Sequence, residues 1–188
     1  MTRLISCRNQ ISKGLLSGMR RTKCSLNAFL KVCLLLPFLV LIFTGCDNEK
    51  FFDQSVSIPG DTWPSDKEVA FSVNIDDTIS PYRFYINVRN STTYRYSNIY
   101  FFLTTEFPGG GMSRDTIECT LAGKTGQWLG KGTGNYRDNR IFIRENIRFP
   151  KKGAYLFRLN QAMREPQLKG ISEAGIRLEK QQLNNIGK

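Results

Sequence analysis

Alternating apolar and polar residues constrain the fold of this chain more than any other feature of its sequence. The stretches 68–75 and 82–89 place Val, Phe, Ile or Tyr at every second position, mostly with polar or small residues between them. A period of two puts one set of side chains on each face of a β-strand, so both stretches predict strands with one buried and one exposed face. Shorter apolar runs follow at 98–107, 116–121, 141–143, 147–149, 155–159 and 176–178.

Clusters of Gly, Pro, Asp and Ser separate these runs and predict turns at intervals of roughly 8–12 residues. Short strands with this spacing, without a long stretch of helical periodicity, favour a single antiparallel β-sandwich of about eight strands. We therefore predict an all-β domain over residues 67–180, either jelly-roll or immunoglobulin-like, with the aromatic stretch 98–107 buried on both faces. Residues 161–164 are predicted to form one helical turn, and residues 181–188 a flexible tail.

An apolar segment of a different kind occupies residues 32–43, and the basic residues Arg20, Arg21, Lys23 and Lys31 precede it. A helix that crosses a bilayer needs about 20 apolar residues, whereas the apolar core of a signal peptide needs about 7–15. The length and the basic flank therefore predict a signal peptide over residues 1–45. Because the stretch before Met19 is long for such a flank, Met19 is an alternative start of the chain.

Cys46 stands where this apolar segment gives way to polar residues. The sequence Phe43-Thr44-Gly45-Cys46 resembles the bacterial lipobox, with Phe43 in place of the more usual Leu. The resemblance implies that the signal is cut between Gly45 and Cys46, that the Cys46 sulfur carries diacylglycerol in a thioether, and that the new amino group is acylated. Residues 46–66 then form the lipidated N-terminus and tether, and the lipid bilayer is the first implied partner. The alternatives are an uncleaved membrane anchor, or a cut elsewhere that leaves Cys46 a free thiol.

Lipidation at Cys46 predicts a location in the cell envelope, but it does not distinguish the inner membrane from the outer membrane. An Asp directly after the lipidated cysteine, as Asp47 is here, implies retention in the inner membrane in enteric bacteria. In Bacteroidetes, acidic residues near this site can instead accompany export to the surface. Inner and outer membrane therefore both stay open.

The charge of the chain is concentrated in the predicted signal peptide. The sequence has 27 Lys and Arg, 16 Asp and Glu and a formal net charge of +11, but seven of the basic residues and none of the acidic ones precede Cys46. The remainder has a net charge of only +4, with acidic and basic residues intermixed. This distribution does not form a basic patch, so no nucleic-acid partner is predicted.

The cysteine and histidine content argues against several kinds of site. Of five cysteines, only Cys46 and Cys119 follow the predicted signal, which is too few for a disulfide framework or a zinc cluster. Cys119 is predicted to be a buried strand residue. The chain has no histidine, which is the commonest general base and transition-metal ligand. No cofactor and no metal site are predicted.

Two pairs of close carboxylates, Asp76 with Asp77 and Asp115 with Glu118, are the remaining candidates for catalysis or for calcium binding. Glycosidases use two carboxylates about 5–9 Å apart, and Ca²⁺ binds clustered oxygens. Adjacent acids at a turn are more often simply solvated, and Asp115 stands at the start of a predicted strand, where Asp is a natural turn residue. We therefore predict that the chain is not an enzyme.

A series of short motifs follows residue 80. The motifs, in order, are YRFYINVRN (82–90), YRYSNIYFF (94–102), Phe107-Pro108, Asp115-Thr116, Leu121-Ala122, GQWLGKGTG (126–134), Phe149-Pro150, Tyr155-Leu156-Phe157, Gln161-Ala162-Met163-Arg164, Leu168-Lys169-Gly170-Ile171 and GIRLEK (175–180). In this order they resemble a known family, the GldH gliding-motility lipoproteins of Bacteroidetes. The resemblance implies a membrane-anchored accessory of the gliding machinery, in a family tied to cell-surface movement and to type IX secretion. It brings no enzymatic activity, cofactor or catalytic residue.

Two tryptophans are candidates for contact with a protein partner. Trp128 lies among glycines in GQWLGKG, and Trp is enriched in the residues that dominate binding energy at interfaces. The more common alternative is that Trp128 covers the core and fixes a glycine-rich connection. Trp63 stands before the first predicted strand, which favours covering the end of a sheet.

A cationic and aromatic sheet face is the second candidate surface. Arg83, Tyr85 and Arg89 share one face of the predicted strand 82–89, and Arg95 follows it. Such a face suits an acidic protein partner or an anionic glycan, although an ordinary polar outer face has similar residues. The sequence thus favours a non-catalytic lipoprotein that binds envelope proteins of the gliding or secretion machinery, and the alternative is a surface lipoprotein that binds carbohydrate.

Overall fold

The computed structural model describes residues 50–181, which form ten strands and one short 3-10 turn. All of these residues fall in the unit Asp47–Lys188. The elements in chain order are β1 (Lys50–Ser57), the turn η2 (Pro59–Asp61), β2 (Thr62–Pro64), β3 (Glu68–Ile75), β4 (Tyr82–Ser91), β5 (Asn98–Glu106), β6 (Met112–Thr120), β7 (Tyr136–Ile147), β8 (Gly153–Gln161), β9 (Gln167–Lys169) and β10 (Ile171–Lys180).

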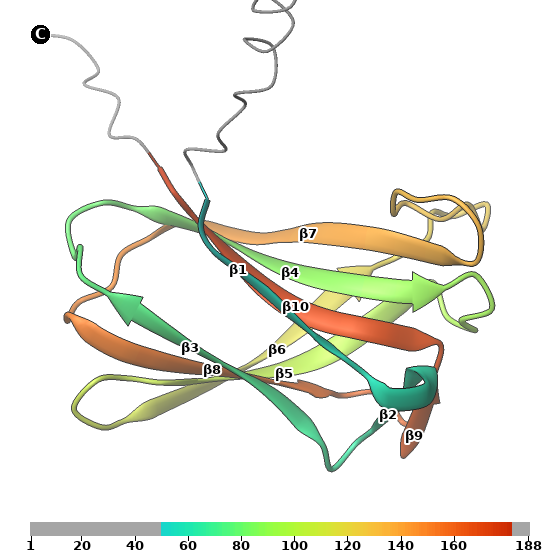
Figure 1. The fold of residues 1–188 in the computed structure, drawn as a ribbon, viewed down its shortest axis with the longest axis horizontal. Helices are drawn as coiled ribbons and strands as arrows, with labels where there is room; N and C mark the ends of the chain where they lie inside the picture. Colours follow the sequence, from blue (N-terminus) through green and yellow to red (C-terminus); the bar gives the residue numbers. More distant parts are fainter. Residues whose placement is uncertain (1–49, 182–188) are drawn as a thin grey trace, which may run out of the picture. The chain divides into compact units, whose positions relative to one another are not determined.

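Eight of these strands build two antiparallel sheets of four strands each. The β4 sheet has the order β1-β10-β4-β7, and the β5 sheet has the order β3-β8-β5-β6. The two sheets form the two layers of a sandwich (Figure 1). The short strands β2 and β9 pair separately with each other. The predicted all-β sandwich is therefore confirmed.

The order of pairing identifies the sandwich as a jelly roll. Among the eight long strands the first pairs with the last, β1 with β10, and the next pairs inward are β3 with β8, β4 with β7, and β5 with β6. Nested hairpins of this kind, distributed over two four-stranded sheets, are the jelly-roll arrangement. An immunoglobulin domain instead divides seven strands into sheets of four and three.

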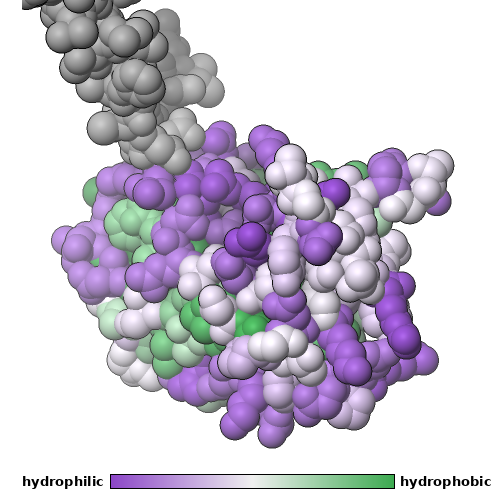
Figure 2. Space-filling model, turned by 45° about the vertical axis from the view of Figure 1, so that its right-hand side comes forward, coloured by the Kyte–Doolittle hydropathy of each residue, from purple (hydrophilic) through white to green (hydrophobic). Residues whose placement is uncertain are grey.

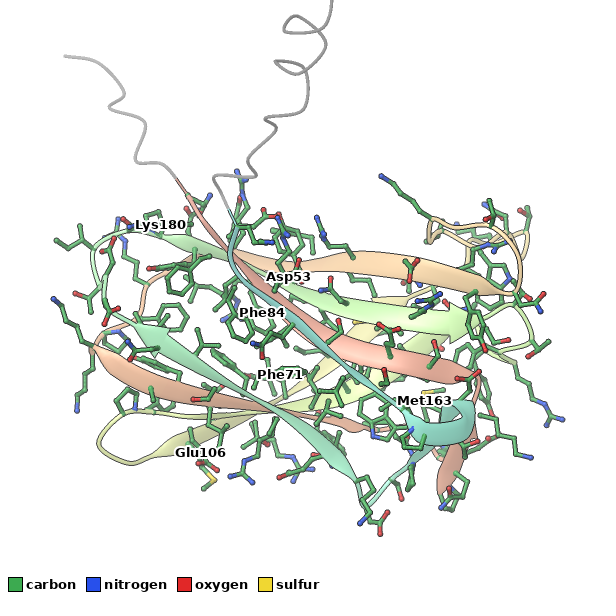
Figure 3. All side chains as sticks on the ribbon, in the orientation of Figure 1. Asp53, Phe71, Phe84, Glu106, Met163 and Lys180 are labelled. Carbon is green, nitrogen blue, oxygen red and sulfur yellow. The ribbon has the colours of Figure 1, made fainter. Side chains whose placement is uncertain are left out.

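The core lies between the two sheets and follows the predicted alternation. In β3 the side chains of Val69, Phe71, Val73 and Ile75 are buried, and in β4 every second side chain from Tyr82 is buried. Phe71 and Phe84 point into the space between the layers (Figure 3). Phe84 of the β4 sheet meets Phe157 of the β5 sheet with ring centroids 5.6 Å apart, so aromatic contacts join the two layers.

Several segments differ from the sequence-based expectation. Residues 50–57, placed in the tether by the sequence, form β1 and pair with β10. The runs 141–143 and 147–149 do not form two strands, because β7 is one strand of 12 residues that ends at Ile147. The outward side chains of β5 are only half-buried, so the expectation that both faces are buried is wrong.

The predicted helical turn at residues 161–164 is also wrong. The amide side chain of Gln161 accepts a hydrogen bond from the Met163 backbone N–H at 2.9 Å and donates to the Glu165 carbonyl at 2.8 Å. The Ala162 N–H donates to the Tyr100 carbonyl of β5 at 2.8 Å. These bonds satisfy backbone groups that a helical turn would use, and the segment bends at Met163 and Arg164 without forming a helix.

A glycine permits the close approach of β1 to β10. A Cβ atom on Gly175 would lie 2.3 Å from the Gln54 carbonyl oxygen of β1, which is shorter than any normal contact. No other residue fits without displacing β1. β1 is therefore held tightly against β10, the last strand of the fold.

Candidate functional site

The predicted lipidation site lies outside the described residues. Gly45 and Cys46 precede residue 50, at which β1 begins, so their arrangement is not part of the structure. In residues 50–181 the structure contains no helix that is long and apolar enough to cross a membrane. The candidate sites among residues 50–181 are therefore the surfaces of the sandwich.

The outer face of the β4 sheet carries most of the predicted partner-binding residues. Arg83, Tyr85, Asn87 and Arg89 alternate along β4 with the buried residues of the core and are all half-buried. The alternation of β4 therefore places three predicted residues, Arg83, Tyr85 and Arg89, on one face. Arg95 lies in the connection after β4, outside the strand.

Arg89 is held by acidic neighbours from both adjacent strands. Its guanidinium donates to Glu173 of β10 at 3.2 Å and lies 3.6 Å from the carboxylate of Asp138 of β7. It also stacks over the Tyr136 ring, 5.2 Å from the centroid. Because two carboxylates already neutralise Arg89, this end of the face is polar without being strongly cationic.

Tyr85 forms the aromatic part of the same face together with a residue that the sequence analysis did not select. Its ring meets Phe142 of β7 edge to face, with centroids 5.7 Å apart, and Phe142 is 52% exposed. Burial, together with the neighbouring Glu179 carboxylate, raises the pKa of Tyr85 above its usual value. The tyrosine therefore stays neutral at physiological pH and presents an apolar ring with a polar tip, a combination that is common at protein interfaces.

A buried ionic cluster fixes the β1 side of this face. Arg177 of β10 is only 3% exposed and donates to Asp53 of β1 and to Glu179, each at 2.7 Å. Asp53 also accepts a hydrogen bond from Asn87 of β4 at 2.8 Å. Figure 3 labels Asp53 beside β1, the edge strand of the β4 sheet that pairs with β10. The cluster thus ties β1, β10 and β4 together on the outer face.

A groove of about 680 Å³ adjoins this face near β7. Its lining includes Leu129, Gly130 and Lys131 from the connection between β6 and β7 and residues 138–141 of β7 itself. Arg89, Arg140, Lys131, Asp138 and Glu173 bring charges of both signs to it. Mixed charges of this kind suit the polar surface of a protein better than a simple anion or cation. The molecular face in Figure 2 is mostly hydrophilic, with hydrophobic residues confined to small areas.

The two candidate tryptophans occupy different environments. Trp63 of β2 is fully buried, donates its indole N–H to the Lys67 carbonyl at 2.8 Å and contacts Phe101. Trp128 is partly buried and packs against the core, and its backbone bridges to Ala122. This arrangement of Trp128 is the one expected for a residue that fixes the glycine-rich connection, and its contact with a partner stays a prediction.

The second sheet offers a smaller candidate surface. A hollow of about 490 Å³ on the β5 sheet is lined by Phe102, Thr104, Arg114, Asn160 and Met163, among others. The Arg114 guanidinium lies 4.2 Å from the centroid of the Phe102 ring. Because a sugar stacks on an open aromatic ring, this covered ring is poorly suited to carbohydrate.

Asp115 and Glu118 do not face each other. Three positions separate Asp115 from Glu118 on β6, so their side chains point to opposite faces of the strand. Glu118 accepts a hydrogen bond from Asn98 at 2.6 Å. Over residues 50–181 there is no group of three or more His, Cys, Asp or Glu residues that could hold a metal ion. Cys119 is buried, as the sequence predicted.

Asp77 has a structural part in the connection between β3 and β4. Its carboxylate accepts hydrogen bonds from the backbone N–H groups of Ile79 and Ser80, at 2.9 and 3.0 Å. It also pairs with the Lys180 ammonium at 2.5 Å. The Lys180 interaction, followed by these backbone hydrogen bonds, lowers the pKa of Asp77 well below 3.8. The turn is therefore held by an ionised carboxylate.

Stability is expected to depend on the ionisation of Asp77 at acid pH. Because its pKa is lower in the folded chain than the unfolded value of 3.8, its stabilising effect is complete above that value and is lost as the pH falls toward the folded pKa. Replacing Asp77 with Asn should lower the urea midpoint at about pH 6 and change it much less at about pH 1.5, close to the folded pKa. Asp76→Asn is the matched control, and an equal loss at both pH values for Asp77→Asn would contradict the assignment.

Three residues of the outer face were missed by sequence reasoning for identifiable reasons. Phe142 lies between Ile141 and Ile143, so it appeared to be part of a short apolar core run. Its outward position becomes visible only when the run is treated as part of a longer strand with a period of two. Asp53 and Arg177 are 124 positions apart, and no sequence signal joins them.

Comparison with known proteins assigns the chain to a family. Residues 50–178 match the GldH lipoprotein family. The gliding motility lipoprotein GldH homolog of Christiangramia forsetii is 33% identical over 150 residues, which cover 76% of this chain and 91% of that protein. The gliding motility lipoprotein GldH of Flavobacterium johnsoniae is 29% identical over 153 residues, which cover 78% of this chain and 94% of that protein.

Similarity to solved structures is weak. Structures of infectious bursal disease virus, one of the Gx strain and one of a VP2 subviral particle, match 73% and 72% of the chain at 15% and 16% identity, with TM-scores of 0.30 and 0.29. This chain covers 34% of each of those chains. The sequence comparisons carry the assignment instead: the chain belongs to the GldH lipoprotein family.

Proposed function

We propose that the protein is a lipid-anchored, non-catalytic accessory of the gliding-motility and type IX secretion machinery of the cell envelope. The observation that carries the proposal is the family match over residues 50–178, together with two curated relatives named as gliding motility lipoproteins. The lipobox-like sequence that ends at Cys46 supports anchoring through a thioether-linked diacylglycerol. Two acyl chains are enough for stable attachment to a membrane.

The outer face of the β4 sheet is the proposed partner-binding surface. It combines the exposed aromatic ring of Phe142, the half-buried Tyr85 and a polar rim that contains Arg89. An aromatic centre with a charged rim is the usual composition of a protein-binding patch. A protein partner is favoured over carbohydrate because Tyr85 and Phe142 pack against each other edge to face and do not form a flat row of open rings.

The function is tested by deleting the gene in a gliding host and complementing it. Loss of surface spreading and of adhesin export on deletion, with recovery by the unchanged gene, is the expected result. Cys46→Ser should fail to restore either activity, and mass analysis of the wild-type protein should find the acylated cysteine. Normal spreading and normal export in the deletion strain would refute the assigned role.

The binding surface is tested with two matched substitutions. Phe142→Glu and Thr116→Glu each place a new carboxylate at an exposed position on an outermost strand, one on β7 and one on β6. We expect Phe142→Glu to abolish complementation and Thr116→Glu to restore spreading, with both proteins present at wild-type levels. Full complementation by Phe142→Glu would show that the partner uses another face.

A further inference from the structure

One end of the sandwich gathers the residues nearest to the predicted lipid. Lys50, the first residue of β1, pairs with Glu179 near the end of β10, and the neighbouring pair joins Tyr82 of β4 to Ile147 of β7. The connections 76–81 and 148–152 begin or end at these strands. In Figure 1 the start of β1 and both connections lie on the same side of the sandwich. We call this region, made of Lys50, residues 76–81, residues 148–152 and Lys180, the anchor end.

The anchor end is a firmly built surface. Phe149 is buried and contacts Tyr82 and Tyr155, with ring centroids 5.3 and 4.8 Å apart, which closes the end of the core. The Asp77 carboxylate fixes the connection 76–81 through its hydrogen bonds to the backbone of Ile79 and Ser80. The side chains of this end are therefore presented on a defined backbone.

Ile79 is an exposed hydrophobic residue that the fold itself does not explain. It is 73% exposed and stands in the turn that Asp77 fixes, so its apolar side chain is held toward solvent. A single exposed apolar residue is ordinary on a soluble protein. Here, however, the exposed isoleucine lies in the same region as a group of basic side chains.

Four basic residues of the anchor end have no acidic partners in the part of the chain that the structure describes. Lys50, Arg148, Lys151 and Lys152 are all exposed, and no ion pair is found for any of them among residues 50–181. Lys180 is different, because it pairs with Asp77. Unpaired basic side chains at the same end as an exposed apolar residue are the composition of surfaces that bind anionic bilayers.

The chain length before β1 limits how far this end can lie from the lipid. Three residues, 47–49, separate Cys46 from Lys50. Even a fully extended backbone covers at most about 14 Å over that interval. If Cys46 is acylated, as the proposed function requires, the anchor end must stay close to the lipid headgroups.

We propose that the anchor end docks on anionic phospholipid headgroups. Lys50, Arg148, Lys151 and Lys152 meet the phosphates, and Ile79 enters the interfacial region of the bilayer. The strands then rise from the membrane, and the outer face of the β4 sheet is turned sideways, open to a protein partner. This inference rests on the proposed lipid anchoring, but it concerns a separate surface.

The cysteines of the protein allow a direct test. In the processed chain, Cys46 carries the lipid and Cys119 is buried, with burial raising the pKa of its thiol to about 12. A maleimide fluorophore therefore reacts selectively with a newly introduced exposed cysteine. Ile79→Cys places the fluorophore at the anchor end, and Leu129→Cys, at a 56% exposed residue between β6 and β7, places it at the opposite end. The chain without an introduced cysteine reports any background labelling.

The acylated full-length protein is incorporated into vesicles of phosphatidylethanolamine and phosphatidylglycerol that contain a spin-labelled quencher lipid. We expect the fluorophore at position 79 to be quenched several-fold more than the one at position 129. With Lys151→Glu and Lys152→Glu added, this quenching should fall, whereas Lys124→Glu with Lys131→Glu, between β6 and β7, should leave it unchanged. Vesicles of phosphatidylcholine alone should give weaker quenching at position 79.

The outcomes separate this inference from the proposed function. If the protein floats with the vesicles and positions 79 and 129 are quenched equally, docking is overturned while lipid anchoring stands, and the anchor end is then free to bind a protein. If the protein does not float with the vesicles, the anchoring proposal fails and the docking inference fails with it. The role given to the basic residues would be contradicted if quenching at position 79 were the same with neutral lipid and with Lys151→Glu and Lys152→Glu.

Discussion

Replacing Trp63 with alanine is expected to lower the free energy of unfolding by about 4 kcal/mol, near the upper end for a single core truncation. Trp63 is among the largest side chains that are fully buried, and it packs on Phe101 of the β5 sheet. Its removal leaves a cavity and also leaves the Lys67 carbonyl without its indole donor. Urea unfolding followed by far-ultraviolet circular dichroism measures the loss.

Trp128 provides the matched control, because it is the other tryptophan of the chain and is only partly buried. Trp128→Ala should cost about 1.5 kcal/mol, since less apolar surface leaves the core. Trp63→Phe, which keeps most of the packing, should cost about 1–2 kcal/mol for the lost hydrogen bond and the smaller ring. Equal losses for the two alanine variants would show that Trp63 is not a central core residue.

Replacing Asp53 with alanine is expected to cost about 3 kcal/mol and to loosen β1. The Arg177 guanidinium is nearly inaccessible to water and then loses a carboxylate that neutralises it. Breaking a buried ion pair from one side is costly because the remaining charge is left uncompensated. Asn87 of β4 loses a partner in the same step. Hydrogen exchange of the β1 and β10 amides locates the effect.

Replacing the whole cluster with apolar residues separates two effects on the free energy of unfolding. One is the penalty for a buried charge that has lost its partner, and the other is the net stabilisation by the ion pairs. The triple variant Asp53→Leu, Arg177→Met and Glu179→Leu removes all three charged side chains of the cluster, so its stability should be close to that of the wild type. The single variant Asp53→Ala should therefore be less stable than the triple variant. The opposite order would mean that the ionic cluster itself stabilises the domain.

The strands of the sandwich were predictable where one face of the strand is buried and the other is exposed to solvent. β3 has the predicted bounds because four buried side chains alternate with exposed ones along its full length. β1 could not be found in this way, since nearly all of its residues are exposed and it is held by backbone pairing and by Asp53. The length of β7 was hidden because Arg140, Arg144 and Glu145 interrupt its apolar positions.

The candidate surface was predictable in part for the same physical reason. The period of β4 alone places Arg83, Tyr85 and Arg89 on one face, so a local pattern was sufficient. Phe142 and Arg177 join that face through strand pairing over long sequence separations. The sequence also does not reveal that Arg177 is buried, because an arginine in an alternating strand looks like an outward, solvated residue.

The nesting of the hairpins has a consequence for the order of folding. β1 pairs only with β10 among the described strands, so residues 50–57 find their place only after residues 173–179 have been made. Contacts between the two ends of a chain close the longest loop and form slowly. A chain that leaves the ribosome or a translocation channel residue by residue therefore stays open until its last strand has emerged. Its attachment strand β1 can be paired only from that point on, because β10 is the strand that holds it.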